Sequence, residues 1–133
     1  MKWFHRTTEP WEIVERRTVE AVPMYAEDEL EEIDVVRVAD VPMGGTYVFD
    51  LRKGADLRRA VVFARQQLLQ EALAKNYNVL LTEGYTFTHM RKGKRHRAEV
   101  RYIARPAHAL GKLPPTPQPP FMAVLDLYVS QLA

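Results

Sequence analysis

The chain contains no cysteine among its 133 residues. This absence excludes disulfide bonds, thiolate zinc sites, iron–sulfur clusters and cysteine nucleophiles. Serine is almost as scarce, because the single serine is Ser130 and no glycine flanks it to form the strained turn of an α/β-hydrolase nucleophile. A serine hydrolase centred on Ser130 is therefore not expected.

Glycine and long apolar runs are also in short supply. The six glycines form neither the G-x-G-x-x-G nor the G-x-x-x-x-G-K-[ST] pattern of phosphate-binding loops, so we predict no cofactor. No apolar run approaches the roughly 18 residues of a membrane span. Residues 1–10 lack the apolar stretch of a signal peptide. We therefore expect a cytoplasmic protein that does not associate with membranes.

The composition itself is typical of one globular domain covering residues 1–133, with 47% hydrophobic and 27% charged residues. The net charge of +2 hides an asymmetry, since residues 1–50 carry 5 basic and 12 acidic side chains, whereas residues 51–133 carry 14 and 5. The simplest interpretation is that the two halves complement each other within the fold or across an oligomer. The alternative is a basic patch for an acidic partner.

Hydrophobic periodicity predicts three strands followed by a helix. The strands are expected at residues 11–22, 33–38 and 46–51, and residues 27–32 between the first two read as a loop or short helical turn. The helix from Leu57 to Lys75 is the clearest element, because its apolar residues recur on one face and Asp56 can cap it. Asn76 suits the left-handed position that ends a helix.

A β-hairpin is predicted next, from residues 78–90 and 94–105, with a two-residue loop at Lys92-Gly93. This register separates an apolar face from a polar face, which a slip of one residue would mix. The predicted pairs are Arg91 with Lys94, Tyr85 with Val100, Phe87 with Ala98, His89 with His96 and Glu83 with Tyr102. Tyr85, Phe87, Ala98, Val100 and Tyr102 are expected to face the core.

After the hairpin, Pro106 is expected to end the strand. Residues 112–120 form a Pro-rich strap, and residues 121–132 are predicted to form a C-terminal helix. The P-x-x-P spacing of the strap suits SH3-type grooves, but we favour a rigid connector. The fold class is then α+β, with a mixed, mainly antiparallel sheet of about five strands, one long helix packed on a face, and the C-terminal helix.

Glu83, Tyr85 and Tyr102 are the candidate catalytic residues. The predicted register puts Glu83 on the apolar face beside both rings, and desolvation of a carboxylate is one way to make a general acid or base near neutral pH. Gly84 offers the alternative of a bulge that turns Glu83 to solvent.

His89 and His96 are the candidate metal ligands, because the predicted hairpin places the two imidazoles side by side. A catalytic zinc site usually needs a third protein ligand, which only His5 or His108 could supply by folding back. We favour the alternative, in which both are amphipathic residues at the end of the sheet.

A candidate surface for anions or acidic partners follows the basic hairpin. It could track phosphates, yet Glu99 interrupts it and the aromatic residues fall on the opposite face, so the stacking platform of a single-strand binder is missing. The residues are Arg91, Lys92, Lys94, Arg95, Arg97, Arg101 and Arg105, with Lys2, Arg6, Arg16 and Arg17 as the next basic group.

Three functions remain open from the sequence. The favoured one is a small non-catalytic binding or interaction domain that associates with itself or with another protein. The second is a cofactor-free isomerase, cyclase or lyase that uses Glu83 as acid or base on a small apolar ligand. The third and least favoured is nucleic-acid binding through residues 91–105. A pocket between the long helix and the sheet would favour the enzyme.

Overall fold

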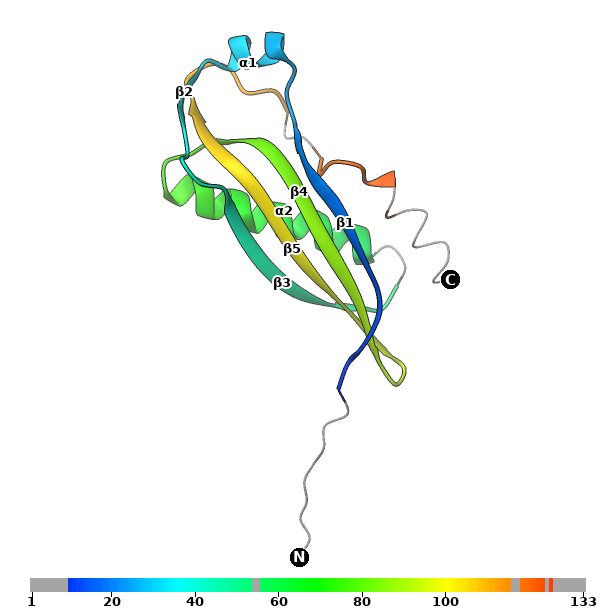
Figure 1. Cartoon of the computed structure of the whole chain (residues 1–133). Helices are drawn as coiled ribbons and strands as arrows, with labels where there is room; N and C mark the ends of the chain where they lie inside the picture. Colours follow the sequence, from blue (N-terminus) through cyan, green and yellow to red (C-terminus); the bar gives the residue numbers. More distant parts are fainter. Residues whose placement is uncertain (1–9, 54–55, 116–117, 124, 126–133) are drawn as a thin grey trace, which may run out of the picture.

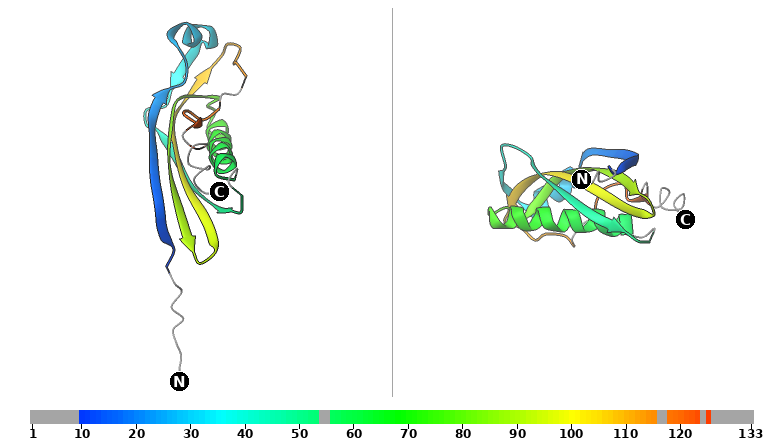
Figure 2. Two further views of the ribbon diagram at one scale, coloured as in Figure 1. Left: turned by 90° about the vertical axis from the view of Figure 1, so that its right-hand side faces the viewer. Right: turned by 90° about the horizontal axis from the view of Figure 1, so that it is seen from below.

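The computed structural model describes residues 10–53, 56–115, 118–123 and 125. They form a five-stranded sheet with one long helix across a single face (Figure 1). Seen edge-on, the sheet has this helix on one side, while no helix of the described residues covers the other side (Figure 2). Among the described residues, no helix is long and apolar enough to cross a membrane. The elements in chain order are β1 (Glu12–Pro23), α1 (Glu27–Ile33), β2 (Val35–Val38), β3 (Met43–Leu51), α2 (Asp56–Ala74), β4 (Val79–Lys92) and β5 (Arg95–Ala109).

The strands are arranged in the order β1-β4-β5, and β2 and β3 both pair with β5 on its remaining side. Every strand pair in the described part of the chain is antiparallel, which confirms the α+β class and corrects the expectation of a mixed sheet. The crossover from β3 through α2 to β4 does connect parallel strands. However, β5 lies between them, so they never pair.

The acidic segment after β1 is a true helix, α1, and this shifts the following strand. Ile33 is buried as the last residue of α1, and Asp34 ends the helix in the left-handed conformation, with φ of 55°. The strand predicted from residue 33 therefore begins at Val35. Acidic residues in the first turn of α1 favour the helix because they face its positive end.

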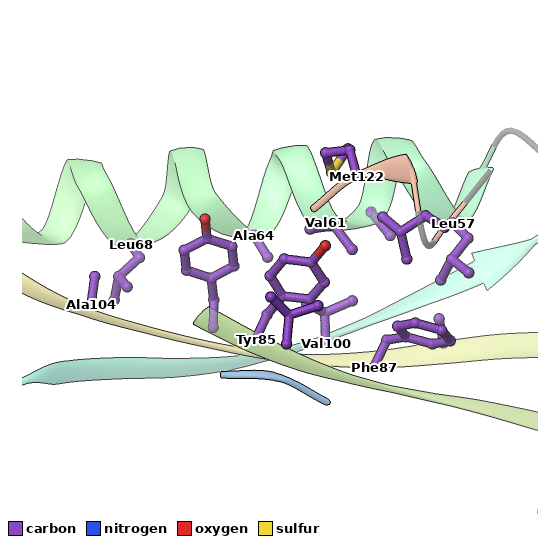
Figure 3. Packing of buried hydrophobic residues seen from close by; sticks show 14 of the residues in the cluster. Leu57, Val61, Ala64, Leu68, Tyr85, Phe87, Val100, Ala104 and Met122 are labelled. Atoms are coloured by element: carbon purple, nitrogen blue, oxygen red, sulfur yellow. The ribbon is translucent and has the colours of Figure 1, made fainter. Parts of the chain in front are cut away.

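The main core lies between α2 and the sheet (Figure 3). The predicted helix face is buried, and the five hairpin residues expected in the core are no more than 2% exposed, which confirms both face assignments. Asn76 has the expected positive φ, 69°, just after α2. The fully buried α2 residues are Leu57, Val61, Ala64, Leu68 and Ala72.

The predicted hairpin register is wrong by one residue in each strand. The loop consists of Gly93 and Lys94, so Lys92 pairs with Arg95, and Tyr85 pairs with Tyr102 instead of Val100. Gly93 has φ of 61°, and a glycine at the first loop position suits the tight turns that match strand twist. The register therefore differs from the predicted one by two residues in total. Since side chains alternate between faces with a period of two, each side chain stays on its predicted face while its cross-strand partner changes.

The end of β5 also differs from expectation. Pro106 does not stop the strand, which continues to Ala109, and the predicted linker from His108 is therefore partly strand. A bulge in β4 opposite Pro106, between Leu80 and Thr82, accommodates the missing backbone donor. The predicted C-terminal helix lies mostly outside the described residues, as does part of the strap at residues 116–117.

Candidate functional site

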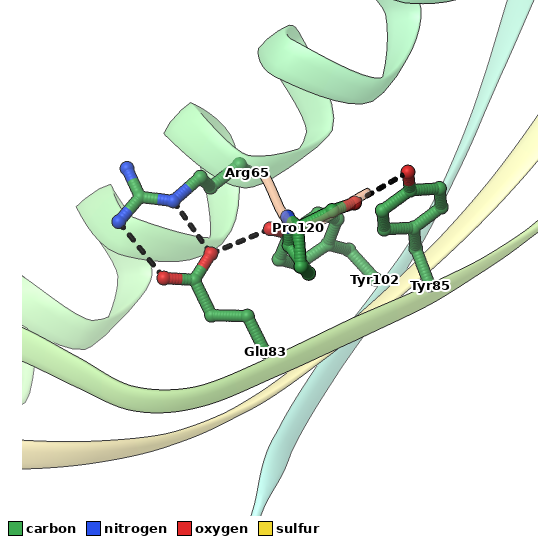
Figure 4. Close-up of polar contacts among 5 residues, drawn as sticks. All are labelled: Arg65, Glu83, Tyr85, Tyr102 and Pro120. Atoms are coloured by element: carbon green, nitrogen blue, oxygen red, sulfur yellow. Dashed lines mark hydrogen bonds and ion pairs between the residues drawn. The ribbon is translucent and has the colours of Figure 1, made fainter. Parts of the chain in front are cut away.

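The predicted catalytic residues do lie together, around a partner that the sequence reasoning missed (Figure 4). Glu83 is completely buried on the α2-facing side of β4. Arg65 of α2 donates from Nε to Oε1 of Glu83 at 2.6 Å and from Nη2 to Oε2 at 3.0 Å. The hydroxyl of Tyr102 donates to Oε1 at 2.5 Å. Both carboxylate oxygens are thus occupied.

The pKa values in this cluster show which groups stay charged. Burial and the neighbouring Glu83 carboxylate raise the pKa of Tyr102, so its hydroxyl keeps the proton that it donates. Burial alone would lower the pKa of Arg65, but its hydrogen bond and charge interaction with Glu83 outweigh burial and raise it. Arg65 therefore remains a cation, and the cluster is a charge-assisted anchor between α2 and the sheet.

Tyr85 completes this region without touching the carboxylate. Its ring stacks on Tyr102 with centroids 5.7 Å apart, and its hydroxyl donates to the carbonyl of Pro120 at 2.8 Å. Burial raises the pKa of Tyr85 to about 12. The cavity that borders Arg65 has a volume of about 60 Å³, which is space on the order of two water molecules.

Gly84 does accompany a bulge, but the bulge is in β1. Val19 pairs with Tyr85 and Val22 with Glu83, so β1 contributes one extra residue opposite Gly84. A Cβ on Gly84 would lie 2.6 Å from the backbone nitrogen of Ala21. Glycine thus lets the bulged part of β1 approach the backbone of β4 closely, while Glu83 still points toward α2.

His89 and His96 meet, but as a hydrogen-bonded pair and not as opposed residues in the register. Nε2 of His89 lies 2.8 Å from Nδ1 of His96, shorter than the about 3.3 Å expected between two nitrogens on one tetrahedral zinc ion. The described residues contain no group of three or more metal-ligating side chains. His108 lies elsewhere, where its Nδ1 contacts the carbonyl of Asn76 at 3.2 Å, and His5 is outside the described residues.

Burial, together with the charges of His96 and Arg91, lowers the pKa of His89.

The basic residues of the hairpin do not form one free stripe. Arg91 pairs with Glu12 at 3.1 Å and Arg97 with Asp50 at 3.6 Å, and both ion pairs join the acidic half of the chain to the basic half. Arg105 donates to two backbone carbonyls before β3.

One aromatic ring does lie against this basic surface, contrary to the prediction that the surface lacks any. Arg97 and Arg95 lie over the ring of Trp11, at 4.3 Å and 5.4 Å from its centroid. Arg101 is exposed and has no hydrogen-bond or ion-pair partner within the described ranges.

The two outer strands of the sheet differ in how open their edges are. β1 has two register shifts against β4 and five charged residues in twelve. β3 pairs with β5 in unbroken register over all nine residues, and its only charged residue is Asp50. No strand of the described part of the chain pairs with the other side of β3. We call that side the open β3 edge.

An apolar groove adjoins the open β3 edge. Phe49 of β3 and Phe63 of α2 meet edge-to-face, with centroids 5.6 Å apart and planes at 86°. Phe63 remains 47% exposed and Val48 53% exposed. We call this the β3 groove; it has a volume of about 580 Å³ and is lined by Val48, Phe49, Asp50, Asp56, Arg59, Ala60 and Phe63.

The walls of the β3 groove are tied together where β3 ends. Oδ2 of Asp56, the first residue of α2, accepts hydrogen bonds from the backbone nitrogens of Arg52 at 2.8 Å and Lys53 at 2.9 Å. These hydrogen bonds lower the pKa of Asp56. The start of α2 is therefore held against the end of β3.

No protein-family model, characterised protein or solved structure matches this chain.

Proposed function

We propose that the protein is a non-catalytic interaction domain that binds an extended protein segment along the open β3 edge. The observation that carries this proposal is the regular nine-residue edge strand beside an apolar groove. In strand addition, backbone hydrogen bonds along the edge supply affinity, and pockets for alternate side chains supply specificity.

The contrast between the two edges supports the choice of β3. Soluble proteins commonly protect edge strands with bulges and charged side chains, because an open edge invites pairing with another chain. β1 has both kinds of protection, whereas β3 has neither a bulge nor more than one charge. Two of the residues that line the β3 groove, Val48 and Phe63, also have exposed apolar side chains.

The enzymatic alternative has less support. Glu83 would have to release Arg65 and Tyr102 before it could accept a substrate proton, and this would leave the guanidinium buried without its counter-charge. The adjoining cavity of about 60 Å³ is also far below the several hundred Å³ of typical ligand pockets.

A peptide copying residues 41–53 is a direct probe of the proposal. We expect it to shift the backbone amide NMR signals of β3 and the signals of Phe63 when added to isotope-labelled protein. Val48→Lys should abolish these shifts, because a lysine on an edge must keep its charge solvated. The matched control is Glu20→Lys on β1, which should leave them unchanged. Shifts that map to β1, or no shifts at millimolar peptide when light scattering shows the chain to be a monomer, would contradict the proposal.

A further inference from the structure

We infer that the segment bound by the open β3 edge is the β3 strand of a second copy of this chain. This inference rests on the proposed function and names its partner. Two copies related by a two-fold axis would pair their β3 strands antiparallel, and the same surface would serve both copies. The two sheets would then join into one continuous sheet.

Full overlap of the two strands defines the arrangement. Met43 then pairs with Leu51 of the second copy, and Tyr47 pairs with its own counterpart across the two-fold axis. Nine paired residues extend for about 30 Å. Because this axis is perpendicular to the sheet, both α2 helices lie on the same face of the joined sheet.

The charges at the two ends of β3 favour this antiparallel arrangement. Asp40 precedes the strand, while Arg52 and Lys53 follow it, and all three are exposed. Antiparallel overlap brings the acidic end of one copy next to the basic end of the other. Parallel pairing would bring like charges together, which is unfavourable.

The side chains of β3 are also compatible with self-pairing. Full overlap places Phe49 opposite Gly45 of the second copy, where that copy's own Tyr47 ring lies over the glycine, so the two aromatic rings would pack against each other. Val48 lies opposite Thr46, and pairs of β-branched residues suit cross-strand contact. No position of the strand brings two charged side chains directly opposite each other, since Asp50 faces Gly44.

The β3 groove explains what such a dimer would bury beyond the backbone edges. Phe63 extends the apolar surface from β3 onto α2 and is 47% exposed in the single chain. With both helices on one face of the joined sheet, the two grooves face each other across the axis. Stable interfaces bury about 1,200–2,000 Å² in total, so contact through the grooves must add to strand pairing.

The absence of cysteine makes disulfide trapping a clean test. We would mix the variants Thr46→Cys and Val48→Cys under mild oxidation, because full overlap places these two positions opposite each other within disulfide range. The control is Glu20→Cys on β1, which is also exposed. Light scattering on the unmodified chain should give the dimer mass, and Val48→Lys should give the monomer mass with unchanged circular dichroism.

We expect the Thr46/Val48 pair to form cross-linked dimers at least tenfold faster than the Glu20 control. If the chain is a monomer at every concentration but still binds the peptide of residues 41–53, the inference of a dimer is wrong and the proposed function stands. If the chain is a monomer and also fails to bind the peptide, both are wrong. A dimer that cross-links faster through Glu20 would overturn the second copy on β3, since it would place the interface on β1, and peptide binding would then decide the proposed function.

Discussion

Arg65 on α2 and Glu83 on β4 form a two-pronged ion pair in which neither side chain is more than 4% exposed. They are 18 positions apart in the chain, and the pair joins the helix to the sheet. Tyr102 supplies a third hydrogen bond to the same carboxylate.

The first prediction concerns this pair. Arg65→Met or Glu83→Gln should each lower the free energy of unfolding by about 3–5 kcal/mol, because each leaves an unpaired polar or charged group buried. The double variant Arg65→Met/Glu83→Gln should lose less than the sum of the two single losses. Urea unfolding measures the free energy of unfolding of all three variants.

Glu12→Gln, which removes an exposed ion pair with Arg91, is the control and should change stability by less than about 1 kcal/mol. Additive losses would contradict a coupled pair.

The second prediction tests the faces of the hairpin. Val100→Asp should unfold the domain, because it puts an unpaired charge at a position with no exposure. Arg101→Asp, one residue further along the same strand, points outward and should stay within about 0.5 kcal/mol of the unmodified chain. Circular dichroism during thermal melting distinguishes the two. Near-native melting of Val100→Asp would show that the face assignment is wrong.

The third prediction concerns Gly84. Gly84→Ala should destabilise the domain by about 1–3 kcal/mol, because the added Cβ would meet the backbone of Ala21 at 2.6–2.7 Å. Gly93→Asn is the matched control, since no atom lies within 4 Å of a Cβ there and asparagine tolerates positive φ. Equal melting temperatures for the two variants would argue against the close approach of β1.

The fourth prediction concerns pH and His89. The pKa of His89 is lowered in the folded chain, mainly by burial, so the unfolded chain binds the extra proton more readily. Stability should therefore fall as the pH drops below about 6.5, the value for an unperturbed histidine, and continue falling until the folded-state pKa is reached. Urea midpoints at pH 7.5 and pH 5.0 measure this loss. His89→Gln should reduce the difference between the two pH values, whereas His108→Gln should retain it.

The fifth prediction concerns nucleic acids. We expect no tight binding of single- or double-stranded oligonucleotides, because Arg97 already engages Asp50 and Trp11 and Glu99 interrupts the surface. Fluorescence anisotropy at about 150 mM salt, where exposed charges are screened over about 8 Å, is a stringent condition. Submicromolar binding that disappears in the Arg97→Glu/Arg101→Glu variant would favour the nucleic-acid function. Binding that persists there would move the site to the basic residues near the N-terminus.

Local periodicity was enough to assign faces. The period of two in β4 and β5 placed Tyr85 and Val100 in the core, and the helical period placed Leu57 and Leu68 against the sheet, because side-chain direction depends only on position within an element. The same periodicity could have drawn attention to Arg65. It lies four residues after buried Val61 and three before Leu68, where a charge in an apolar stripe must have a buried partner.

The tertiary structure alone decided which elements meet. The cross-strand partners in the hairpin depended on whether Gly93 is the first or the second residue of the two-residue loop. Either position leaves every side chain on the same face of the sheet. That β5 separates β3 from β4 follows from long-range packing, which no local pattern records. The pairing of Arg65 with Glu83 and the open β3 edge are consequences of that strand order. Faces are set by neighbours along the chain, whereas partners and edges are set by contacts between segments distant in sequence, and these form only when the whole sheet is assembled.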